Sequence, residues 1–275
     1  MTAEAVVERL FPGREARRLG GGWVSHTFEV DGWILQVADC AYGSERLRYQ
    51  ALVVPRLAAH LATAIPRPEL VCEAPVANRY RKLEGLPCDE VPGGRWPEQL
   101  GAMLRALQAL DPAAIGVAPL GPGQLRDRQR AACDRIRASV VPRLEPHERA
   151  AAGALLDALL DERHWQFTPV LSHADLGPEH VLVDPAGDLA AVIDWEELGP
   201  GNPIDDFAWW LHAMPEVGER MLRGLGATLD EHRARARLAY AVMPWHEVDH
   251  GIRTHDDACI ASGLAGVRAR MPTNG

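Results

Sequence analysis

The stretches "LSHADLGPEHVLVD" at residues 171–184 and "AAVIDWEE" at residues 190–197 decide the fold of this chain. The first places a His, an Asp and a second His between apolar runs. The runs "VLV" and "AAVI" are separated by Pro-Ala-Gly-Asp, which is typical of a turn, so we predict two short strands joined as a hairpin. A hairpin brings its entry loop near its exit. We therefore expect Asp175, His180 and Asp194 to converge, although each of them alone would be an ordinary loop residue.

The composition excludes several classes of protein. The chain has 275 residues, 47% of them hydrophobic, with a net charge of −9 and a pI near 5.7. A chain of this size buries a substantial core. Its acidic balance lacks the basic footprint of a nucleic-acid-binding protein and suits a cationic small substrate. The N-terminal residues do not follow the signal-peptide pattern, and no apolar run approaches the roughly 20 residues that span a bilayer. We expect a cytoplasmic protein without a membrane or nucleic-acid partner, monomeric or weakly dimeric.

Two regions differ in their pattern. Residues 1–85 contain alternating apolar and polar runs, and Asp31-Gly32 between two such runs is a strong signal for a β-hairpin. Residues 44–62 have helical spacing, and two further strands follow before a predicted hinge at Glu84-Gly85. The later pattern is mainly helical. We therefore predict an α+β, two-lobed protein, with a small antiparallel β-rich lobe over residues 1–85 and a large α-helical lobe over residues 86–275.

The sequences "HADLGPEHVLVD" and "VIDWEELGPGNPIDDFA" resemble the catalytic core of the aminoglycoside phosphotransferase family, whose fold is protein-kinase-like. The family's loop reads His-x-Asp-x-x-x-x-Asn, and Ile-Asp-[Phe/Trp] follows on the next hairpin, the counterparts of the kinase H-R-D and D-F-G elements. The resemblance implies transfer of the γ-phosphoryl group of ATP or GTP, with Mg²⁺, to a hydroxyl of a cationic small molecule. An antibiotic such as an aminoglycoside or a macrolide is the leading acceptor class. Acceptors of the related choline, homoserine and thiosugar kinases stay open alternatives.

The resemblance assigns roles by position. Asp175 matches the catalytic aspartate that orients the accepting hydroxyl and takes its proton, and His173 matches the histidine that braces the loop. Asp194 matches the magnesium-binding aspartate. His180 stands where Asn is commonest, as in macrolide and 2″-acting aminoglycoside phosphotransferases, and a neutral imidazole nitrogen there serves as the second metal ligand. In "GNPIDDFA", Asp206 matches the aspartate that anchors the loop.

The resemblance is incomplete in the small lobe. Kinases of this type pair a lysine on the third strand with the nucleotide phosphates and with a glutamate on the first helix. Here Gln36 and Gln50 occupy those positions, and amides lack the charge of a cation. Lys82, the single lysine of the chain, lies near the hinge, which leaves Arg46, Arg48 or an N-terminal arginine as sources of the cation. The alternative is a catalytically inert kinase-like protein that binds nucleotide or another ligand. The predicted nucleotide-binding residues are Ser25 and His26 beside the glycine-rich bend, Gln36, Gln50, Lys82 and Leu83.

A competing motif lies in "HEVDHGIRTHDD" at residues 246–257. Its His-Glu-x-x-His spacing places His246 and His250 one helical turn apart, as in zinc metallohydrolases. However, Gly251 predicts that the helix ends there, and no third ligand follows at a known spacing. The kinase-like interpretation instead makes this segment part of the acceptor site, where carboxylates hold the protonated amines of a cationic acceptor. The candidates for that role are Glu196, Glu197, Asp205, Glu247, Asp256 and Asp257.

Overall fold

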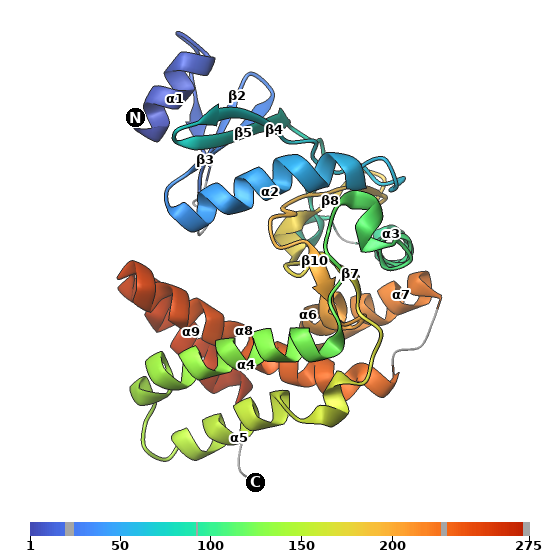
Figure 1. Cartoon of the computed structure of the whole chain (residues 1–275). Helices are drawn as coiled ribbons and strands as arrows, with labels where there is room; N and C mark the ends of the chain where they lie inside the picture. Colours follow the sequence, from blue (N-terminus) through green and yellow to red (C-terminus); the bar gives the residue numbers. More distant parts are fainter. Residues whose placement is uncertain (20–24, 92, 227–229, 272–275) are drawn as a thin grey trace.

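The computed structural model describes residues 1–19, 25–91, 93–226 and 230–271. A small part rich in antiparallel strands lies above a larger helical part (Figure 1), which confirms the predicted two-lobed α+β architecture. We propose that the lobes meet at Gly85, because Leu86 already pairs with Val183 in a sheet of the large lobe. Gly85 has a φ of 131°, and a Cβ atom there would lie 2.9 Å from the Cβ atom of Leu182. The crossing between the lobes therefore requires glycine.

The small lobe is built on a five-stranded antiparallel sheet in the order β1-β2-β3-β5-β4. Asp31 and Gly32 join β2 to β3 with φ values of 49° and 73°, the pattern of a type I′ turn, so the predicted hairpin is confirmed. Helix α1 packs its apolar side chains on one face of the sheet, and α2 lies on the other side (Figure 1). The bounds are α1 Ala3–Leu10, β1 Arg17–Arg18, β2 Ser25–Val30, β3 Trp33–Ala38, α2 Ala41–Leu57, β4 Glu69–Glu73 and β5 Val76–Arg81.

Helix α2 begins and ends earlier than the predicted range 44–62. The side chain of Cys40 accepts a backbone N–H from the first turn and caps the helix there. At the other end, the N–H of His60 donates to a carbonyl only three residues before it, and this tighter turn stops the helix. The buried Nδ2 of Asn78 donates to the carbonyl oxygen of Leu47 (2.6 Å), which ties α2 to β5.

Two small sheets carry the hairpin predicted around the catalytic motif. Strands β8 and β9 pair antiparallel, and the N–H of Gly187 donates to the carbonyl oxygen of Asp184 (3.0 Å) in the turn between them. Strand β6 extends this sheet, and β7 pairs with β10 in the other. The predicted hairpin is therefore confirmed. The bounds are β6 Leu86–Pro87, β7 Val170–Ser172, β8 Val181–Val183, β9 Leu189–Val192 and β10 Gly199–Gly201.

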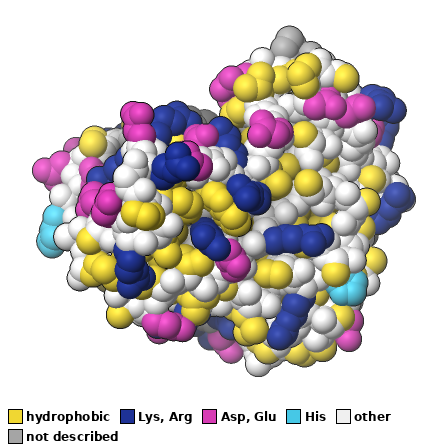
Figure 2. Space-filling model, turned by 90° about the horizontal axis from the view of Figure 1, so that it is seen from above, with side chains coloured by type: hydrophobic (Ala, Val, Ile, Leu, Met, Phe, Trp, Pro, Cys, Tyr) yellow, Lys and Arg dark blue, Asp and Glu magenta, His cyan; other side chains and the backbone are white. Residues whose placement is uncertain are grey.

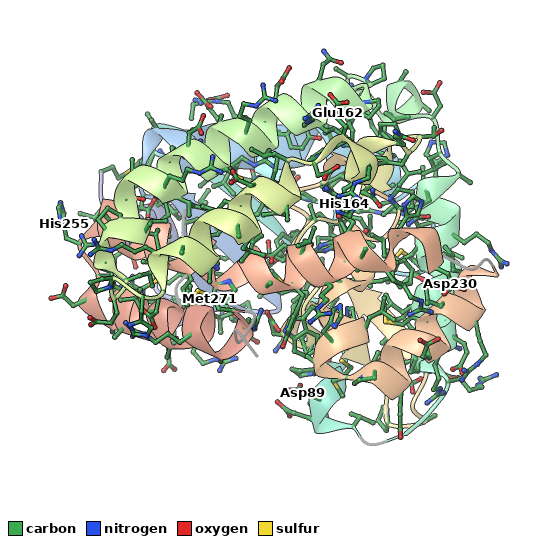
Figure 3. All side chains as sticks on the ribbon, turned by 90° about the horizontal axis from the view of Figure 1, so that it is seen from below. Asp89, Glu162, His164, Asp230, His255 and Met271 are labelled. Carbon is green, nitrogen blue, oxygen red and sulfur yellow. The ribbon has the colours of Figure 1, made fainter. Side chains whose placement is uncertain are left out.

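Helices form most of the large lobe. Seen from below, α4, α5 and α8 lie side by side, and α8 runs between Asp230 and His255 (Figure 3). Helix α8 does not end at Gly251, so that prediction was wrong. A Cβ atom at position 251 would lie 2.9 Å from the carbonyl oxygen of Asp256, which shows that this glycine allows α9 to approach closely. The bounds are α3 Trp96–Gln108, α4 Pro122–Ser139, α5 Arg149–Leu159, α6 Ala208–Ala213, α7 Pro215–Leu225, α8 Arg233–Thr254 and α9 Asp257–Arg270.

The largest buried cluster joins the two lobes. It contains Val53, Val54 and Leu57 from the C-terminal half of α2 together with Trp195 and Leu198 from the segment after β9. Burying an apolar side chain of this size contributes roughly 1.5–3 kcal/mol. The C-terminal half of α2 is therefore fixed against the large lobe by apolar packing.

The surface mixes side-chain types. On the face seen from above, acidic, basic and hydrophobic side chains are interspersed (Figure 2). Singly scattered hydrophobic side chains of this kind are normal on a globular protein. In the described part of the chain, no helix combines the length and the apolar composition needed to cross a bilayer.

Candidate active site

Three of the predicted residues meet at one end of the β8–β9 hairpin. Asp175 and His180 precede β8, and Asp194 follows β9. The Nε2 atom of His180 lies 3.4 Å from Oδ2 of Asp194, and its Nδ1 atom lies 4.0 Å from Oδ2 of Asp175. The hairpin register causes this approach, because the N–H of Ile193 donates to the carbonyl oxygen of His180 (2.9 Å) just beyond the paired strands.

The contacts of His180 orient its ring toward Asp194. The Nδ1 atom lies 2.7 Å from the carbonyl oxygen of Asp175, so Nδ1 carries the proton and donates it there. In the neutral ring, the lone pair of Nε2 then faces Asp194. The Oδ1 atom of Asp194 is buried and has no hydrogen-bond partner among the described residues. The imidazole nitrogen of His180 and the carboxylate of Asp194 are thus close enough to contact one cation.

His180 and Asp194 could hold a magnesium ion more readily than a zinc ion. Within residues 1–19, 25–91, 93–226 and 230–271, no group of three or more His, Cys, Asp or Glu side chains is placed to hold a metal. Protein zinc sites use three or four such ligands. Mg²⁺ usually keeps several waters and takes one or two protein ligands together with substrate phosphates. His180 and Asp194 match that smaller requirement.

Asp206 anchors the start of the catalytic loop. Its buried carboxylate accepts hydrogen bonds from Oγ of Ser172 (2.9 Å) and from the N–H groups of His173 (3.0 Å) and Ala174 (2.9 Å). These bonds hold Ala174 at a φ of 69°, a left-handed conformation that residues other than glycine rarely adopt. Burial raises the pKa of Asp206 to about 6, and the three donors oppose the rise. The side chain therefore shapes the loop from the interior of the lobe.

His173 connects the catalytic loop to the strand that leads to Asp194. Its ring is fully buried, with Nε2 donating to the carbonyl oxygen of Ile193 (2.9 Å) and Nδ1 accepting from the N–H of Asp175 (3.3 Å). The ring packs 4.6 Å from that of Trp195. Burial lowers the pKa of His173 to about 3, so the ring is neutral around pH 7.

Acidic side chains crowd around Asp175. Protein atoms desolvate its carboxyl group and raise its pKa, His180 opposes the rise, and Asp194 and Glu179 add to it. Burial raises the pKa of Glu196 to about 8, and the charges of Asp194, Glu197 and Asp175 reinforce this. Glu179 was missed from the sequence because an acidic residue in a loop has no distinguishing pattern. Crowded carboxylates of this kind favour the binding of cations.

Glu197 and Asp205 are already engaged by other groups. Oε1 of Glu197 accepts a hydrogen bond from Tyr42 (2.9 Å). Oδ2 of Asp205 accepts the N–H of Asn202 (3.1 Å), and its Oδ1 lies 3.4 Å from Nε of the buried Arg235. Asp205 therefore serves the packing of the loop before α6, in contrast to the predicted contact with the acceptor.

The remaining acidic candidates lie around the α8–α9 junction. The side chain of Asp256 caps α9 by accepting the N–H groups of Ala258 and Cys259 (3.0 Å each). Asp257 is exposed in the first turn of α9, and Glu247 is partly exposed on α8. Among the described residues, the contacts of these three carboxylates do not connect them to the catalytic loop.

Gln36 and Gln50 are buried next to Asp194. With Tyr80 and Asp194 they line a cavity of about 10 Å³, which is close to the space that one water molecule occupies. Oε1 of Gln36 has no hydrogen-bond partner in the described part of the chain. Tyr80 was missed from the sequence, since an aromatic residue on a strand is usually part of the core. Its burial in this cavity raises its pKa, and the charge of Asp194 adds to the rise.

The structure separates the two residues predicted to touch phosphate on β2. Thr27 pairs directly opposite Gln36, and side chains alternate between the faces of a strand, so Ser25 shares the face of Gln36. His26 points to the opposite face, where Arg18 Nη2 lies 2.8 Å from its Nδ1. The prediction for His26 therefore needs correction, because its side chain is on the α1 side of the sheet.

Lys82 and Leu83 also lie away from the Gln36 cavity. Nζ of Lys82 pairs with Oε1 of Glu29 (2.8 Å), which holds this cation against β2. Leu83 lines a separate groove of about 490 Å³ together with Trp33. The glycine-rich bend predicted to cover phosphate falls at residues 20–24, outside the described residues.

The zinc alternative finds no third ligand. His246 and His250 lie one turn apart on α8, as their spacing predicts. The described residues contain no group of three potential metal-binding side chains that includes this pair. A His-Glu-x-x-His site of the zinc hydrolases requires such a ligand, so the structure does not bring this motif together as a metal centre.

Comparisons with known proteins identify the family and support the fold. Over 140 residues the chain is 30% identical to viomycin phosphotransferase of Streptomyces vinaceus, a match that covers 48% of this chain and only 47% of that relative. An aminoglycoside 2′-phosphotransferase-IIIa solved with GDP has a TM-score of 0.82 at 19% identity, covering 97% of this chain and 96% of that one. A macrolide 2′-phosphotransferase from Brachybacterium faecium has a TM-score of 0.70 at 22% identity, covering 98% and 97%. Residues 15–239 match the phosphotransferase enzyme family, and the chain belongs to that family.

Proposed function

We propose that this protein transfers the γ-phosphoryl group of ATP or GTP to a hydroxyl of a cationic small molecule, most specifically an antibiotic of the aminoglycoside or macrolide type. The observation that carries the proposal is the convergence of Asp175, His180 and Asp194 at one end of the β8–β9 hairpin. Membership of the phosphotransferase enzyme family and similarity to viomycin phosphotransferase support it. The fold is also that of enzymes solved with GDP and with kanamycin.

Asp175 is the proposed catalytic base. Its side chain is 57% exposed, so an acceptor hydroxyl can reach it, while the loop behind it is held by His173 and Asp206. Phosphoryl transfer depends mainly on positioning and charge neutralisation, because the protein makes few covalent changes itself. A carboxylate that orients the hydroxyl and accepts its proton typically contributes about 10²- to 10⁴-fold to the rate.

His180 and Asp194 are the proposed ligands of Mg²⁺, which neutralises phosphate charge when it is bound with the nucleotide. His180 holds its Nε2 toward Asp194 through the hydrogen bond from its Nδ1. Asp194 has a φ of 63° and an unpartnered Oδ1. Strained conformations of this kind cost about 1–3 kcal/mol and persist where the surrounding structure holds them. This backbone conformation sets the direction of the carboxylate, whose Oδ2 lies 3.4 Å from Nε2 of His180.

The acidic surroundings suit a cationic acceptor. Glu179 lies close enough to Asp175 and Asp194 to raise the pKa values of their carboxyl groups, and these two aspartates in turn raise the pKa of Glu196. Protonated amines of an acceptor would relieve this repulsion through charge-assisted hydrogen bonds. A neutral or anionic acceptor would gain nothing from such hydrogen bonds, which is why we favour antibiotics that carry protonated amines.

The test is direct measurement of phosphoryl transfer. Purified protein is incubated with ATP or GTP, Mg²⁺ and a panel of aminoglycosides, macrolides, viomycin, choline and homoserine, and phosphorylated products are identified by mass spectrometry. Asp175→Asn should lower the rate by about 10²- to 10⁴-fold, because an amide does not take up the proton. Asp127→Asn on the exposed surface of α4 is the matched control and should retain the rate. If no acceptor is phosphorylated although nucleotide binds, the inert binding protein becomes the better interpretation.

A further inference from the structure

One face of α2 holds the segment between β9 and β10. The hydroxyl of Tyr42 donates to Oε1 of Glu197 (2.9 Å), and Nε of Arg46 lies 3.7 Å from the same oxygen. The hydroxyl of Tyr49 donates to the carbonyl oxygen of Leu198 (2.8 Å). These three side chains are spaced i, i+4 and i+7, so they form a single stripe along the helix. The stripe contacts the chain only a few residues after the proposed metal ligand.

Polar contacts dominate at this end of α2. Its C-terminal half is fixed by the buried side chains of Val53, Val54 and Leu57. Near the other end, Leu47 packs into a small cluster with Ala38 and Val76 of the small-lobe sheet, and Tyr42 is 49% exposed. The placement of the first turns against the segment after β9 therefore depends strongly on the contacts that Tyr42 and Arg46 make with Glu197.

Arg46 supplies the charge that the buried amides lack. Gln50 lies one helical turn after Arg46 and faces the cavity shared with Gln36, where two neutral amides provide no ionic attraction between β3 and α2. The Nε atom of Arg46 is buried without a hydrogen-bond partner in the described chain, and the guanidinium lies 4.8 Å from the centre of the Tyr49 ring. The same Nε atom lies 3.7 Å from Oε1 of Glu197. Arg46 therefore faces the acidic site.

Arg48 differs from Arg46 although it is only two residues away. Its Nη2 atom lies 3.0 Å from Oε2 of Glu73 at the end of β4, and both side chains are largely exposed. This pair is on the outer side of the small lobe. Of the two arginines of α2 that the sequence offered as replacement cations, only Arg46 contacts the segment after Asp194.

We propose that Arg46 and Glu197 form a positioning pair that holds the Asp194-bearing segment against α2. The inference rests on the proposed function, because its purpose is to place Asp194 for a metal–nucleotide complex. Arg46 acts through this segment and is not itself a catalytic residue. Glu197 is accordingly a partner of Arg46 and not a ligand of the acceptor.

The pair is tested first without nucleotide, by hydrogen–deuterium exchange of the peptide covering residues 194–201. Arg46→Gln should raise exchange there by roughly 3- to 10-fold, as expected for the loss of one partly buried charge pair. Arg48→Gln is the matched control and should leave this peptide unchanged. Arg46→Glu and Glu197→Arg should each raise exchange, and the double variant with the charges reversed should return it to within about 2-fold of the wild type.

The same variants are then compared in turnover. Arg46→Gln should lower kcat by about 10-fold while the KM for the acceptor stays unchanged, since a displaced catalytic group affects the chemical step. The inference is overturned if Arg46→Gln and Arg48→Gln have equal effects on exchange, or if the reversed pair is no better than the single reversals. If the exchange results hold but the wild type phosphorylates no acceptor, the pair stands and the proposed function fails.

Discussion

Removal of the Ser172 hydroxyl should weaken the anchor of the catalytic loop. The hydroxyl donates to the buried Oδ1 of Asp206 at 2.9 Å, and Ser172 itself is 2% exposed. Hydrogen bonds to charged groups contribute about 1.5–3 kcal/mol, so Ser172→Ala should lower the free energy of unfolding by about that amount at pH 8. For a domain of this size, each kcal/mol corresponds to roughly 2–4 °C in Tm. Turnover should fall as well, because Ala174 loses part of the support for its left-handed backbone.

The matched control is Ser139→Ala, which removes a 2.9 Å hydrogen bond from a serine to Asp249 at a part-buried position away from the loop. We expect Ser139→Ala to lower the free energy of unfolding by less than Ser172→Ala does, and to leave kcat unchanged.

Chemical denaturation at several pH values provides a second check. Burial raises the pKa of Asp206 to about 6, and loss of a donor to the ionised form raises it further. A carboxyl group with a raised pKa contributes stability that is lost as pH rises through the pKa of the folded state. The difference in the free energy of unfolding between Ser172→Ala and the wild type should therefore grow between pH 5 and pH 8. Equal unfolding free energies at pH 8, within 0.5 kcal/mol as an approximate error margin, would refute the reasoning.

Three further predictions follow from buried groups. Burial lowers the pKa of His173 to about 3 in the folded protein, so its contribution to stability is lost as pH falls below about 6.5. His173→Gln should therefore reduce the slope of the free energy of unfolding against pH by about 1.4 kcal/mol per pH unit between pH 6.5 and 5, measured by urea denaturation. Gln36→Lys alone forces a longer, charged side chain into the cavity of about 10 Å³ beside Asp194 and should destabilise the protein. Gln36→Lys with Gln50→Glu adds a carboxylate partner, so it should recover stability and tighten nucleotide binding in titration calorimetry, whereas additive effects would contradict this. Gly251→Ala should lower stability by about 1–3 kcal/mol, because the added methyl group overpacks against α9. Gly153→Ala has open space around it in α5 and should raise stability by about 0.5–1 kcal/mol, with both variants measured by thermal denaturation.

Local patterns were sufficient for the elements that depend on short-range physics. Asp31-Gly32 predicted a hairpin because both residues tolerate positive φ, and the structure has it. The hairpin around Pro-Ala-Gly-Asp followed in the same way. The end of α8 could not be predicted, because Gly251 serves the packing of α9, a contact that spacing along one helix does not reveal. His26 was placed on the wrong face, since the face of a strand residue depends on the register with its partner strand.

For the site, the sequence alone supplied the candidate residues, and the tertiary structure decided which of them share a location. The loop residues Asp175, His180 and Asp194 were found together because a short hairpin brings its two ends close regardless of what surrounds it. The sequence did not predict which groups lie next to Gln36, Glu197 and the arginines of α2. Whether Arg46 or Arg48 faces the site depends on the rotation of α2 about its axis, and long-range packing of its apolar half sets that rotation.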